Sequence, residues 1–559
     1  MSDFISTDEP GLDQAGAALT AVQGLIHQAL THLKTSATVA GRTDPARLDE
    51  LQLVSYEIAV CWAECTAARF SLNHAARVSA SATGVTLTAD LAGLFTAEAI
   101  INTANRLRAR PGDFGLDNTT ISACLAPHEP VTSAQLSAAN LDRIGQALLE
   151  CGGDLGPDLL SEHHTMMRDT FHRFADDVVM PLAEEIHRQD LDIPDDILEP
   201  LKEMGMFGLS IPESYGGLQE NDEEDTLGMI VVTEELSRGS LGAAGSLITR
   251  PEILARALLK GGTEVQKRHW LPQLAVGEPL CAVAVTEPNY GSDVAGVKLK
   301  ATRVDGGWQL DGAKTWCTFG GKAGLLLVLA RTDPDPALGH KGLTMFLVEK
   351  PSHSGHAFDV QQDAGGKLGG RAIATLGYRG MHSFELFFDE FFVPDSHVLG
   401  EQGGEGKGFY YAMAGFAGGR IQTAARAVGV MRAAFERSLS YACERQVFGQ
   451  VIGNYPLTRS KLARMAAQIL ACRQITYDVA DMMDQGAGDM EASAAKLFAG
   501  RAAEWLTREA LQIHGGMGYA EETPVSRYFV DARVLSIFEG AEETLALKVI
   551  TRALLETID

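Results

Sequence analysis

The sequence lacks the features that mark disulfide-rich, zinc-binding and membrane-spanning proteins. Its eight cysteines are scattered, and no C-x-x-C pair is matched by a second pair, which argues against zinc and disulfide frameworks. His163 and His164 have no acidic or cysteine partner at ligand spacing, so we expect no bound metal. No apolar run approaches the length of a membrane span. The opening MSDFISTDEP lacks a signal-peptide core and an arginine-rich transit pattern, so we expect a cytoplasmic location.

Positive charge is also scarce. The chain has 47 Lys and Arg against 73 Asp and Glu, a formal net charge of −26. Nucleic acids and anionic membrane surfaces require basic patches, so we expect neither as a partner. A phosphate-binding loop is absent too, because the glycine-rich stretch 400–408 has Gly408 after Lys407 where that motif needs Ser or Thr.

Hydrophobic periodicity predicts four domains, since 559 residues exceed a single core. Apolar residues at helical spacing predict a helical segment over residues 1–150 and another over 158–279. From Leu280 the period is that of strands, which predicts a β domain over 280–398. Helical spacing returns over 399–559, with enough long helices for a four-helix bundle. The predicted class is α+β and mostly helical.

The predicted β domain consists of short runs rich in β-branched and aromatic residues. Asp305-Gly306-Gly307 and Asp311-Gly312 between them have the composition of hairpin turns. The expected strands are 281–287, 298–304, 308–310, 325–331, 343–349 and 384–389.

The segment 285–293, Val-Thr-Glu-Pro-Asn-Tyr-Gly-Ser-Asp, has the residues of a ligand-binding loop. Pro288 ends the strand, and Gly291 allows a ligand to approach the backbone closely. Ser292 and the loop N–H groups can hold a phosphate without positive charge. The alternative is a plain turn.

A second segment, 314–321, combines a large aromatic side chain with hydroxyl donors. Trp316 is flat enough to cover a planar cofactor, and Thr318 can donate a hydrogen bond to the edge of a flavin ring. The alternative is a tryptophan of the hydrophobic core.

Two helix ends carry a third pattern, Glu-Arg-Gln-Val-Phe-Gly at 444–449 and Gln-Ile-His-Gly-Gly at 512–516. Arg445 can bind a pyrophosphate, and the glycine pair offers bare backbone for close contact. We expect His514 to be structural.

Glu539 lies where an apolar run meets Gly540, just before an amphipathic helix. One interpretation is a first-turn acid favoured by the helix dipole, as expected for Glu542 and Glu543. The other is a general base in apolar surroundings.

Taken together, these motifs resemble the acyl-CoA dehydrogenase family over residues 158–559. The shared pattern is VTEPxxGSD, KxWxTxxGKA, ERxxFG, QIxGGxGY and a terminal FEG, in that order. The resemblance implies a helical domain, a β domain and a helical bundle, with FAD between the last two. Residues 1–150 are then an extra helical N-terminal domain.

The resemblance also implies roles for matching residues. Glu539 is expected to be the catalytic base, because Gly419 occupies the alternative base position before Arg420. Arg420 and Gly540 are expected at the substrate, and Ser292 and Gly291 at its phosphate entrance. The expected FAD contacts are Val285, Thr286, Gly291, Ser292, Trp316, Thr318, Arg445, Phe448, Gln512 and Gly516, the last four across a subunit boundary.

The expected reaction is α,β-dehydrogenation of an acyl-CoA. With its extra domain and the FEGAEET variant of the base motif, the chain resembles a bacterial branch of the family that acts on (2S)-methylsuccinyl-CoA. This resemblance implies a short branched substrate with a free carboxylate, mesaconyl-CoA as the product and a bacterial cytoplasm as the location. Arg250 and His382 are candidate anchors for that carboxylate. An ordinary short-chain substrate, or an oxidase using oxygen, is the alternative.

The expected partners follow from the same resemblance. Electron-transfer flavoprotein is the expected acceptor, and the expected assembly is a homodimer or a dimer of dimers. A flavin monooxygenase is disfavoured by Glu539, and a DNA-binding relative by the net charge of −26. We expect the N-terminal domain to pack over the core or a subunit interface, where it would replace contacts that other members make by forming tetramers.

Overall fold

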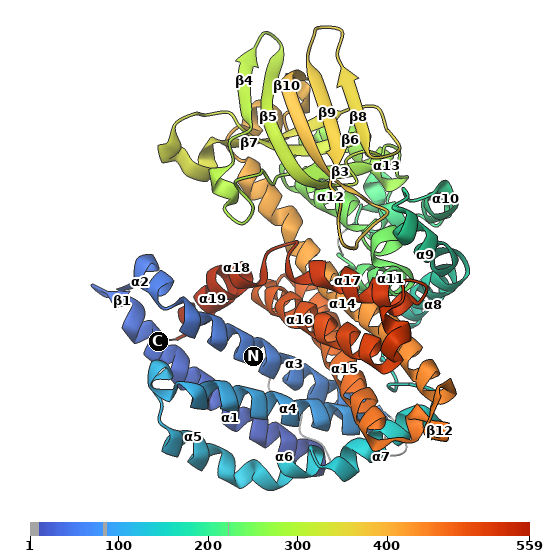
Figure 1. Cartoon of the computed structure of the whole chain (residues 1–559). Helices are drawn as coiled ribbons and strands as arrows, with labels where there is room; N and C mark the ends of the chain where they lie inside the picture. Colours follow the sequence, from blue (N-terminus) through green and yellow to red (C-terminus); the bar gives the residue numbers. More distant parts are fainter. Residues whose placement is uncertain (1–9, 82–86, 222, 559) are drawn as a thin grey trace. The chain divides into compact units, whose positions relative to one another are not determined.

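The computed structural model describes residues 10–81, 87–221 and 223–558 (Figure 1). The chain forms two compact units. Unit 1 comprises the residues up to Thr165 and those from Thr423 onward, and unit 2 comprises Met166–Gln422. Among the described residues, no helix is long and apolar enough to cross a membrane.

Unit 1 is helical and joins the two ends of the sequence. Its N-terminal part contains α1 (Pro10–Ala37), α2 (Pro45–Glu50), α3 (Gln52–Ser81), α4 (Leu87–Ala109), α5 (Asn118–Leu125), α6 (Glu129–Gln135) and α7 (Ala138–Glu150). Its C-terminal part contains the end of α14 (Gly408–Glu444), then α15 (Pro456–Asp484), α16 (Asp489–His514), α17 (Pro524–Ala532), α18 (Glu542–Thr544) and α19 (Thr551–Glu556).

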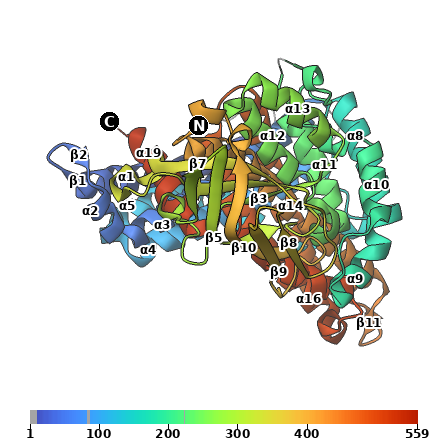
Figure 2. The same cartoon turned by 90° about the horizontal axis from the view of Figure 1, so that it is seen from above.

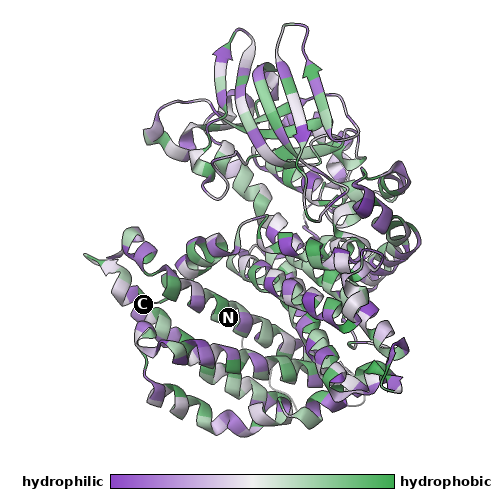
Figure 3. Cartoon of the chain, in the orientation of Figure 1, coloured by the Kyte–Doolittle hydropathy of each residue, from purple (hydrophilic) through white to green (hydrophobic). Residues whose placement is uncertain are grey.

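The N-terminal helices pack directly on the C-terminal helices within this unit. Helix α3 is the centre, because it contacts α1, α4, α15 and α16 and is buried along most of its length. Its alanines allow close approach of neighbouring helices. Helix α7 lies so close to α15 that a Cβ at Gly145 would stand 2.2 Å from the Arg459 carbonyl oxygen. Figure 3 shows hydrophobic and hydrophilic residues interleaved along these helices.

Unit 2 combines helices with a sheet. Its helices are α8 (Glu162–Phe174, which begins in unit 1), α9 (Met180–Gln189), α10 (Asp195–Glu203), α11 (Thr226–Gly239), α12 (Thr249–Gly261) and α13 (Glu264–Ala275). A π-helical turn, Ala175–Val179, joins α8 to α9. Helix α12 packs against strand β3 (Figure 2).

The eight-stranded sheet is mixed. Its strand order is β3-β6-β4-β5-β10-β9-β8, with β7 also paired to β6. The strands are β3 (Cys281–Ala284), β4 (Lys300–Val304), β5 (Gly307–Thr318), β6 (Leu325–Arg331), β7 (Leu343–Glu349), β8 (Ala357–Gln361), β9 (Lys367–Ala372) and β10 (Ser383–Pro394).

Strand β6 lies between two hydrophobic clusters, because its successive side chains point to opposite faces of the sheet. Leu325, Leu327 and Leu329 belong to a cluster shared with α12 and α13. The residues between them belong to a cluster with β5 and β10. A central strand buried on both faces explains why its sequence is continuously apolar.

The predicted turn at Asp311-Gly312 is wrong. Strand β5 continues through these residues, and Gly312 has φ +131°. Opposite them β10 has a bulge, in which Glu390 donates its N–H to Asp311 Oδ1 at 2.9 Å. Turn-forming residues therefore accommodate a bulge. The predicted turn at Asp305-Gly306 is confirmed, because Val304 pairs with Gly307.

Other boundaries also differ from the sequence prediction. The strand expected over 281–287 ends at Ala284, and those expected over 308–310 and 384–389 are the longer β5 and β10. Strands β8 and β9, which flank 362–366, have too few β-branched residues to be recognised.

Candidate active site

The predicted site residues divide between the two units. Glu539, Gly540 and the four predicted ADP contacts lie in unit 1. The predicted flavin contacts and both carboxylate anchors lie in unit 2, together with Ser292 and Arg420.

The backbone at Glu539 is held in an unusual conformation. Glu539 has φ +52° and Gly540 has φ +100°. The positive φ at residue 540 favours glycine, and a Cβ there would also stand 2.9 Å from Leu545 Cδ2, so that a larger residue would have to displace the Leu545 side chain. The buried Lys496 fixes this turn by donating from Nζ to the Gly540 carbonyl oxygen at 2.5 Å. Left-handed backbone at a non-glycine residue is uncommon and concentrates at functional sites.

The Glu539 carboxylate has an unused acceptor. Its Oε2 is buried and accepts no hydrogen bond from any residue that the structure describes. Buried carboxylate oxygens are nearly always hydrogen-bonded, so this one is an exception that needs a reason. A free lone pair in a buried position is what a general base requires.

The N-terminal domain supports the segment that carries Glu539, the predicted base. Tyr56, on α3, donates its hydroxyl to Glu542 Oε1 at 2.9 Å. Arg501 donates to the Tyr56 hydroxyl at 2.7 Å and to Glu542 Oε1 at 3.2 Å. Burial raises the pKa of Tyr56 to about 12, and the bond to Glu542 adds to this. Sequence analysis missed Tyr56, because nothing in the sequence links residues almost 500 positions apart.

We expect Tyr56→Phe to lower the free energy of unfolding by about 1.5 kcal/mol, the lower range for a hydrogen bond to a charged group. Arg501 would still pair with Glu542, which limits the loss. Denaturant unfolding measures the change, and kcat should fall modestly because Glu542 lies three residues after Glu539. Tyr519→Phe is the control, since Tyr519 is 86% exposed. Equal stability of the two variants would contradict this role of Tyr56.

The structure brings the two predicted ADP-binding segments together. The rings of Tyr441 and His514 stack with centroids 4.3 Å apart, which joins the end of α14 to the end of α16. His514 Nδ1 also bonds the Ala510 carbonyl oxygen at 2.8 Å, so its role here is structural. Arg445, Gln512 and Gly516 are exposed beside this stack.

Phe448 stands out among these exposed residues. It lies between the two-residue strands β11 (Gln446–Val447) and β12 (Gln450–Val451), has φ +51° and is 94% exposed. A phenylalanine held outward in this way has no role in the core of its own unit. Its ring is therefore accessible to a ligand or to a second chain.

In unit 2, a buried ion pair fixes the first predicted flavin segment. Lys314 Nζ, on β5, donates to the Val285 carbonyl oxygen at 2.9 Å and to Glu287 Oε1 at 2.8 Å. Burial lowers the pKa of Lys314 to about 8 against the opposing effect of Glu287, so the lysine is still largely charged at pH 7. The Thr286 carbonyl oxygen accepts the Thr315 N–H at 2.9 Å. These bonds hold segment 285–287 in a fixed position against segment 314–315.

The second flavin segment presents an aromatic side chain outward. Trp316 has φ +55° and is 54% exposed although it lies within β5. Two residues on, the Thr318 and Ser383 hydroxyls are 3.0 Å apart. The alternative of a core tryptophan is wrong. An exposed aromatic face, a nearby hydroxyl and the open backbone at Gly291 are suited to a large planar cofactor.

Arg250 is a buried cation of unit 2. It lies on α12, is only 6% exposed and donates from Nη1 to the Ser246 carbonyl oxygen at 3.2 Å. No carboxylate in the described part of the chain forms an ion pair with it. Burial raises the pKa of Cys281 to about 12, and the nearby Arg250 charge opposes this shift. Burial likewise raises the pKa of Cys317 to about 12, and the Arg250 charge is among those that oppose this shift. Arg250 therefore lies close to β3 and β5, which carry the flavin motifs.

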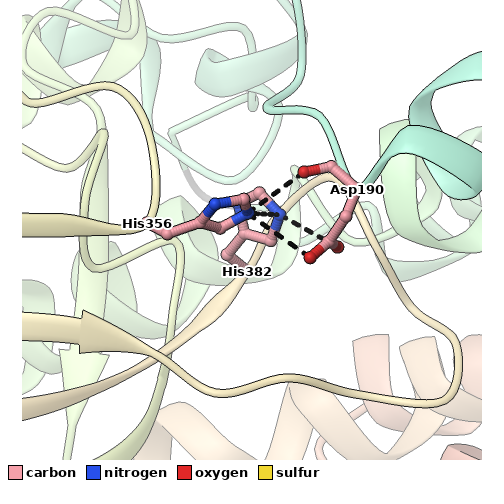
Figure 4. A group of neighbouring side chains, drawn as sticks. All are labelled: Asp190, His356 and His382. Atoms are coloured by element: carbon pink, nitrogen blue, oxygen red, sulfur yellow. Dashed lines mark hydrogen bonds and ion pairs between the residues drawn. The ribbon is translucent and has the colours of Figure 1, made fainter.

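His382 is bonded to acidic residues of its own unit (Figure 4). Its Nδ1 lies 3.0 Å from Asp192 Oδ1, and its Nε2 lies 3.3 Å from Asp190 Oδ1. Burial alone would lower the pKa of His382, but these carboxylates outweigh it and raise the pKa overall. Both ring nitrogens therefore already have partners, which leaves Arg250 as the other candidate anchor predicted from the sequence. Ser292 is exposed and Arg420, on α14, is partly buried.

Three family models match the chain in sequence order. They are the acyl-CoA dehydrogenase N-terminal domain at residues 161–278, the middle domain at 282–391 and the C-terminal domain at 406–555. The chain belongs to the acyl-CoA dehydrogenase family. It is a FAD-dependent acyl-CoA dehydrogenase, consistent with the flavin-suited groups on β5.

Individual relatives differ in how much of the chain they cover. The (2S)-methylsuccinyl-CoA dehydrogenase of Cereibacter sphaeroides is 38% identical over 558 residues, which are 98% of each chain. Butyryl-CoA dehydrogenase of Megasphaera elsdenii has a TM-score of 0.65 and 32% identity, covering 72% of this chain and 100% of its own. A chain from a structure titled for the electron transferring flavoprotein of Acidaminococcus fermentans has a TM-score of 0.64 and 30% identity, covering 71% of this chain and 99% of its own.

Proposed function

We propose that this acyl-CoA dehydrogenase oxidises (2S)-methylsuccinyl-CoA to mesaconyl-CoA. The observation that carries the proposal is Arg250, a buried guanidinium with no carboxylate partner among the described residues. The similarity to the Cereibacter sphaeroides enzyme supports it, because that similarity includes the N-terminal domain.

Arg250 provides what a substrate carboxylate needs. An isolated buried charge is costly, and a bidentate carboxylate offsets that cost better than a backbone carbonyl. A butyryl chain has no such group and would leave the guanidinium unpaired. We infer that Arg250 binds the free carboxylate of the acyl group.

The chemistry follows from the position of Glu539. The thioester carbonyl acidifies the α-proton, and Glu539 removes it through Oε2, which accepts no hydrogen bond from any described residue. FAD, when bound, accepts the β-hydrogen with its electron pair. As negative charge develops on the thioester oxygen, the Glu539 N–H is the donor that we assign to it. The left-handed turn at Glu539-Gly540 sets the direction of this N–H.

The first experiment adds methylsuccinyl-CoA or butyryl-CoA anaerobically to the purified enzyme and follows the flavin absorbance. We expect methylsuccinyl-CoA to bleach the flavin faster. Arg250→Met should lower kcat/KM for methylsuccinyl-CoA by about 30-fold or more, the cost of truncating one partner of a buried charge pair. Butyryl-CoA should be affected much less.

Arg303→Met is the matched control, since the side chain of Arg303 is 54% exposed on the β domain. Equal losses for both substrates in Arg250→Met would contradict the anchoring role. Bleaching by butyryl-CoA alone would be consistent with an acyl-CoA dehydrogenase but would contradict methylsuccinyl-CoA as its substrate.

We propose electron-transfer flavoprotein as the acceptor and a homodimer or dimer of dimers as the assembly. The exposed Phe448, Arg445 and Gln512 support a second copy that covers them. The packing of α3 on α15 and α16 supports a dimer, in which the N-terminal domain replaces tetramer contacts. Light scattering of the FAD-loaded protein tests this, and a monomer would contradict it. We place the enzyme in a bacterial cytoplasm.

A further inference from the structure

Three side chains from distant parts of unit 2 converge on one point (Figure 4). Asp190 ends helix α9, and its backbone is left-handed with φ +54°. His356 immediately precedes strand β8, and His382 immediately precedes β10. Their ligand atoms all lie within 4.8 Å of one another. The sequence predicted no bound metal. Its ligand spacing could not reveal this group, because the members are separated by up to 192 residues.

The shortest distances within this group are of the length expected between ligands of one small ion, with Asp190 facing the two histidines through different carboxylate oxygens. His356 Nε2 lies 3.3 Å from His382 Nε2. Asp190 Oδ1 lies 3.3 Å from His382 Nε2, and Asp190 Oδ2 lies 3.4 Å from His356 Nε2. Zinc–nitrogen and zinc–oxygen bonds of about 2.0–2.1 Å in a tetrahedron place neighbouring ligand atoms about 3.3–3.4 Å apart.

Hydrogen bonding also directs lone pairs at this point. Asp192 accepts from the Gly355 N–H at 2.5 Å through Oδ2 and lies 3.0 Å from His382 Nδ1 through Oδ1. A neutral His382 therefore carries its proton on Nδ1 and presents the lone pair of Nε2 to Asp190 and His356. Metal-binding histidines usually donate their second N–H to a carboxylate in this way.

We propose that Asp190, His356 and His382 bind a Zn²⁺ ion, with water as the remaining ligand. Two imidazoles and one carboxylate are a donor set that zinc accepts. The His382 side chain is 5% exposed, whereas those of Asp190 and His356 are 34% and 54% exposed, so the ion has access from solvent on one side. Arg379 Nε is 3.6 Å from Asp190 Oδ1 but is also bound to the Thr375 carbonyl oxygen at 3.2 Å.

The ion would connect the helical part of unit 2 to two strands of its sheet. The His382 carbonyl oxygen accepts the Phe319 N–H at 2.8 Å. The next residue, Ser383, bonds the predicted flavin contact Thr318 at 3.0 Å. Zinc bound at His382 therefore stabilises the strand ends that carry the flavin-binding hydroxyl. Its role is structural, and it is independent of which acyl-CoA is oxidised.

The test uses the full-length, tag-free, FAD-loaded enzyme. After treatment with EDTA, isothermal titration with ZnCl₂ should give one tight site per chain, and zinc X-ray absorption should show only N and O ligands at about 2.0–2.1 Å. His356→Ala should abolish this site. Asp192→Asn should weaken it by about 10–100-fold, the usual effect of removing a carboxylate behind a metal-bound histidine.

His353→Ala is the matched control, because His353 is a partly buried histidine three residues before His356 that is not one of the three candidate ligands, so zinc binding should be unchanged. His356 itself is 54% exposed, so its variant should fold, which its FAD content and melting curve verify. Absence of a stoichiometric zinc site in the wild type would overturn the proposal. His382 would then be connected to Asp190 and Asp192 by hydrogen bonds alone. Unchanged binding in His356→Ala would overturn it as well.

Discussion

Glu539→Gln is expected to retain FAD and to lose about 10²–10⁴-fold in kcat, the usual contribution of a positioned general base. Glutamine keeps the size of the side chain and the left-handed turn with Gly540. It removes the basic lone pair of Oε2, the buried oxygen that accepts no bond from any described residue. Anaerobic stopped-flow should therefore show substrate binding without rapid flavin reduction.

Glu543→Gln is the control for this experiment. Glu543 is an exposed carboxylate four residues after Glu539 on the same segment, and its variant should keep normal turnover. Gly419 leaves no carboxylate at the alternative base position, so no second base is expected to rescue the Glu539 variant. Turnover near the wild-type value in Glu539→Gln would reject the assignment.

Lys314→Met is expected to destabilise the fold by about 3–5 kcal/mol, because it leaves the Glu287 charge buried without its partner. Glu287 also accepts the Lys298 and Leu299 N–H groups, each at 2.7 Å, so it cannot turn away to solvent. The variant should also lose FAD, since the ion pair fixes the backbone on both sides of Thr286. Denaturant unfolding and the flavin absorbance of the purified protein measure both effects.

The double variant Glu287→Gln/Lys314→Met separates charge from packing. Removing both charges should recover part of the stability lost in Lys314→Met, because no uncompensated charge remains buried. Lys300→Met is the control, since Lys300 is an exposed lysine of the neighbouring strand β4. A double variant less stable than Lys314→Met would show that the pair acts in some way other than charge compensation.

The N-terminal domain has a direct connection to the catalytic segment. Besides Tyr56, the Ser55 carbonyl oxygen accepts from Thr551 Oγ1 at 3.0 Å, and Asp49 pairs with Lys548. These contacts attach the end of α2 and the start of α3 to the helical segment that follows Glu539. Helices from residues 1–150 therefore stabilise the segment that carries Glu539, the predicted base.

Some of the fold was predictable because it depends on local periodicity. Strands β6 and β7 match their predicted bounds, since both are continuous apolar runs between turn residues. Helix α16 (Asp489–His514) is one of the long helices that helical spacing predicts within 399–559. Strands β8 and β9 were missed, because pairing with β10 and not their composition makes them strands. The four domain boundaries and the roles of the site residues stay predictions.

The sequence by itself determined the family, the cofactor and the residue expected to act as base, because these depend on short motifs whose order and spacing are specific. Only the tertiary structure decided which groups surround those motifs. Among the described residues, it left Glu539 Oε2 without a hydrogen-bond donor and Arg250 without a carboxylate, placed Tyr56 against Glu542, and brought Asp190, His356 and His382 together. The physical reason is that pairing and burial depend on contacts between residues far apart in the chain, which no local pattern encodes.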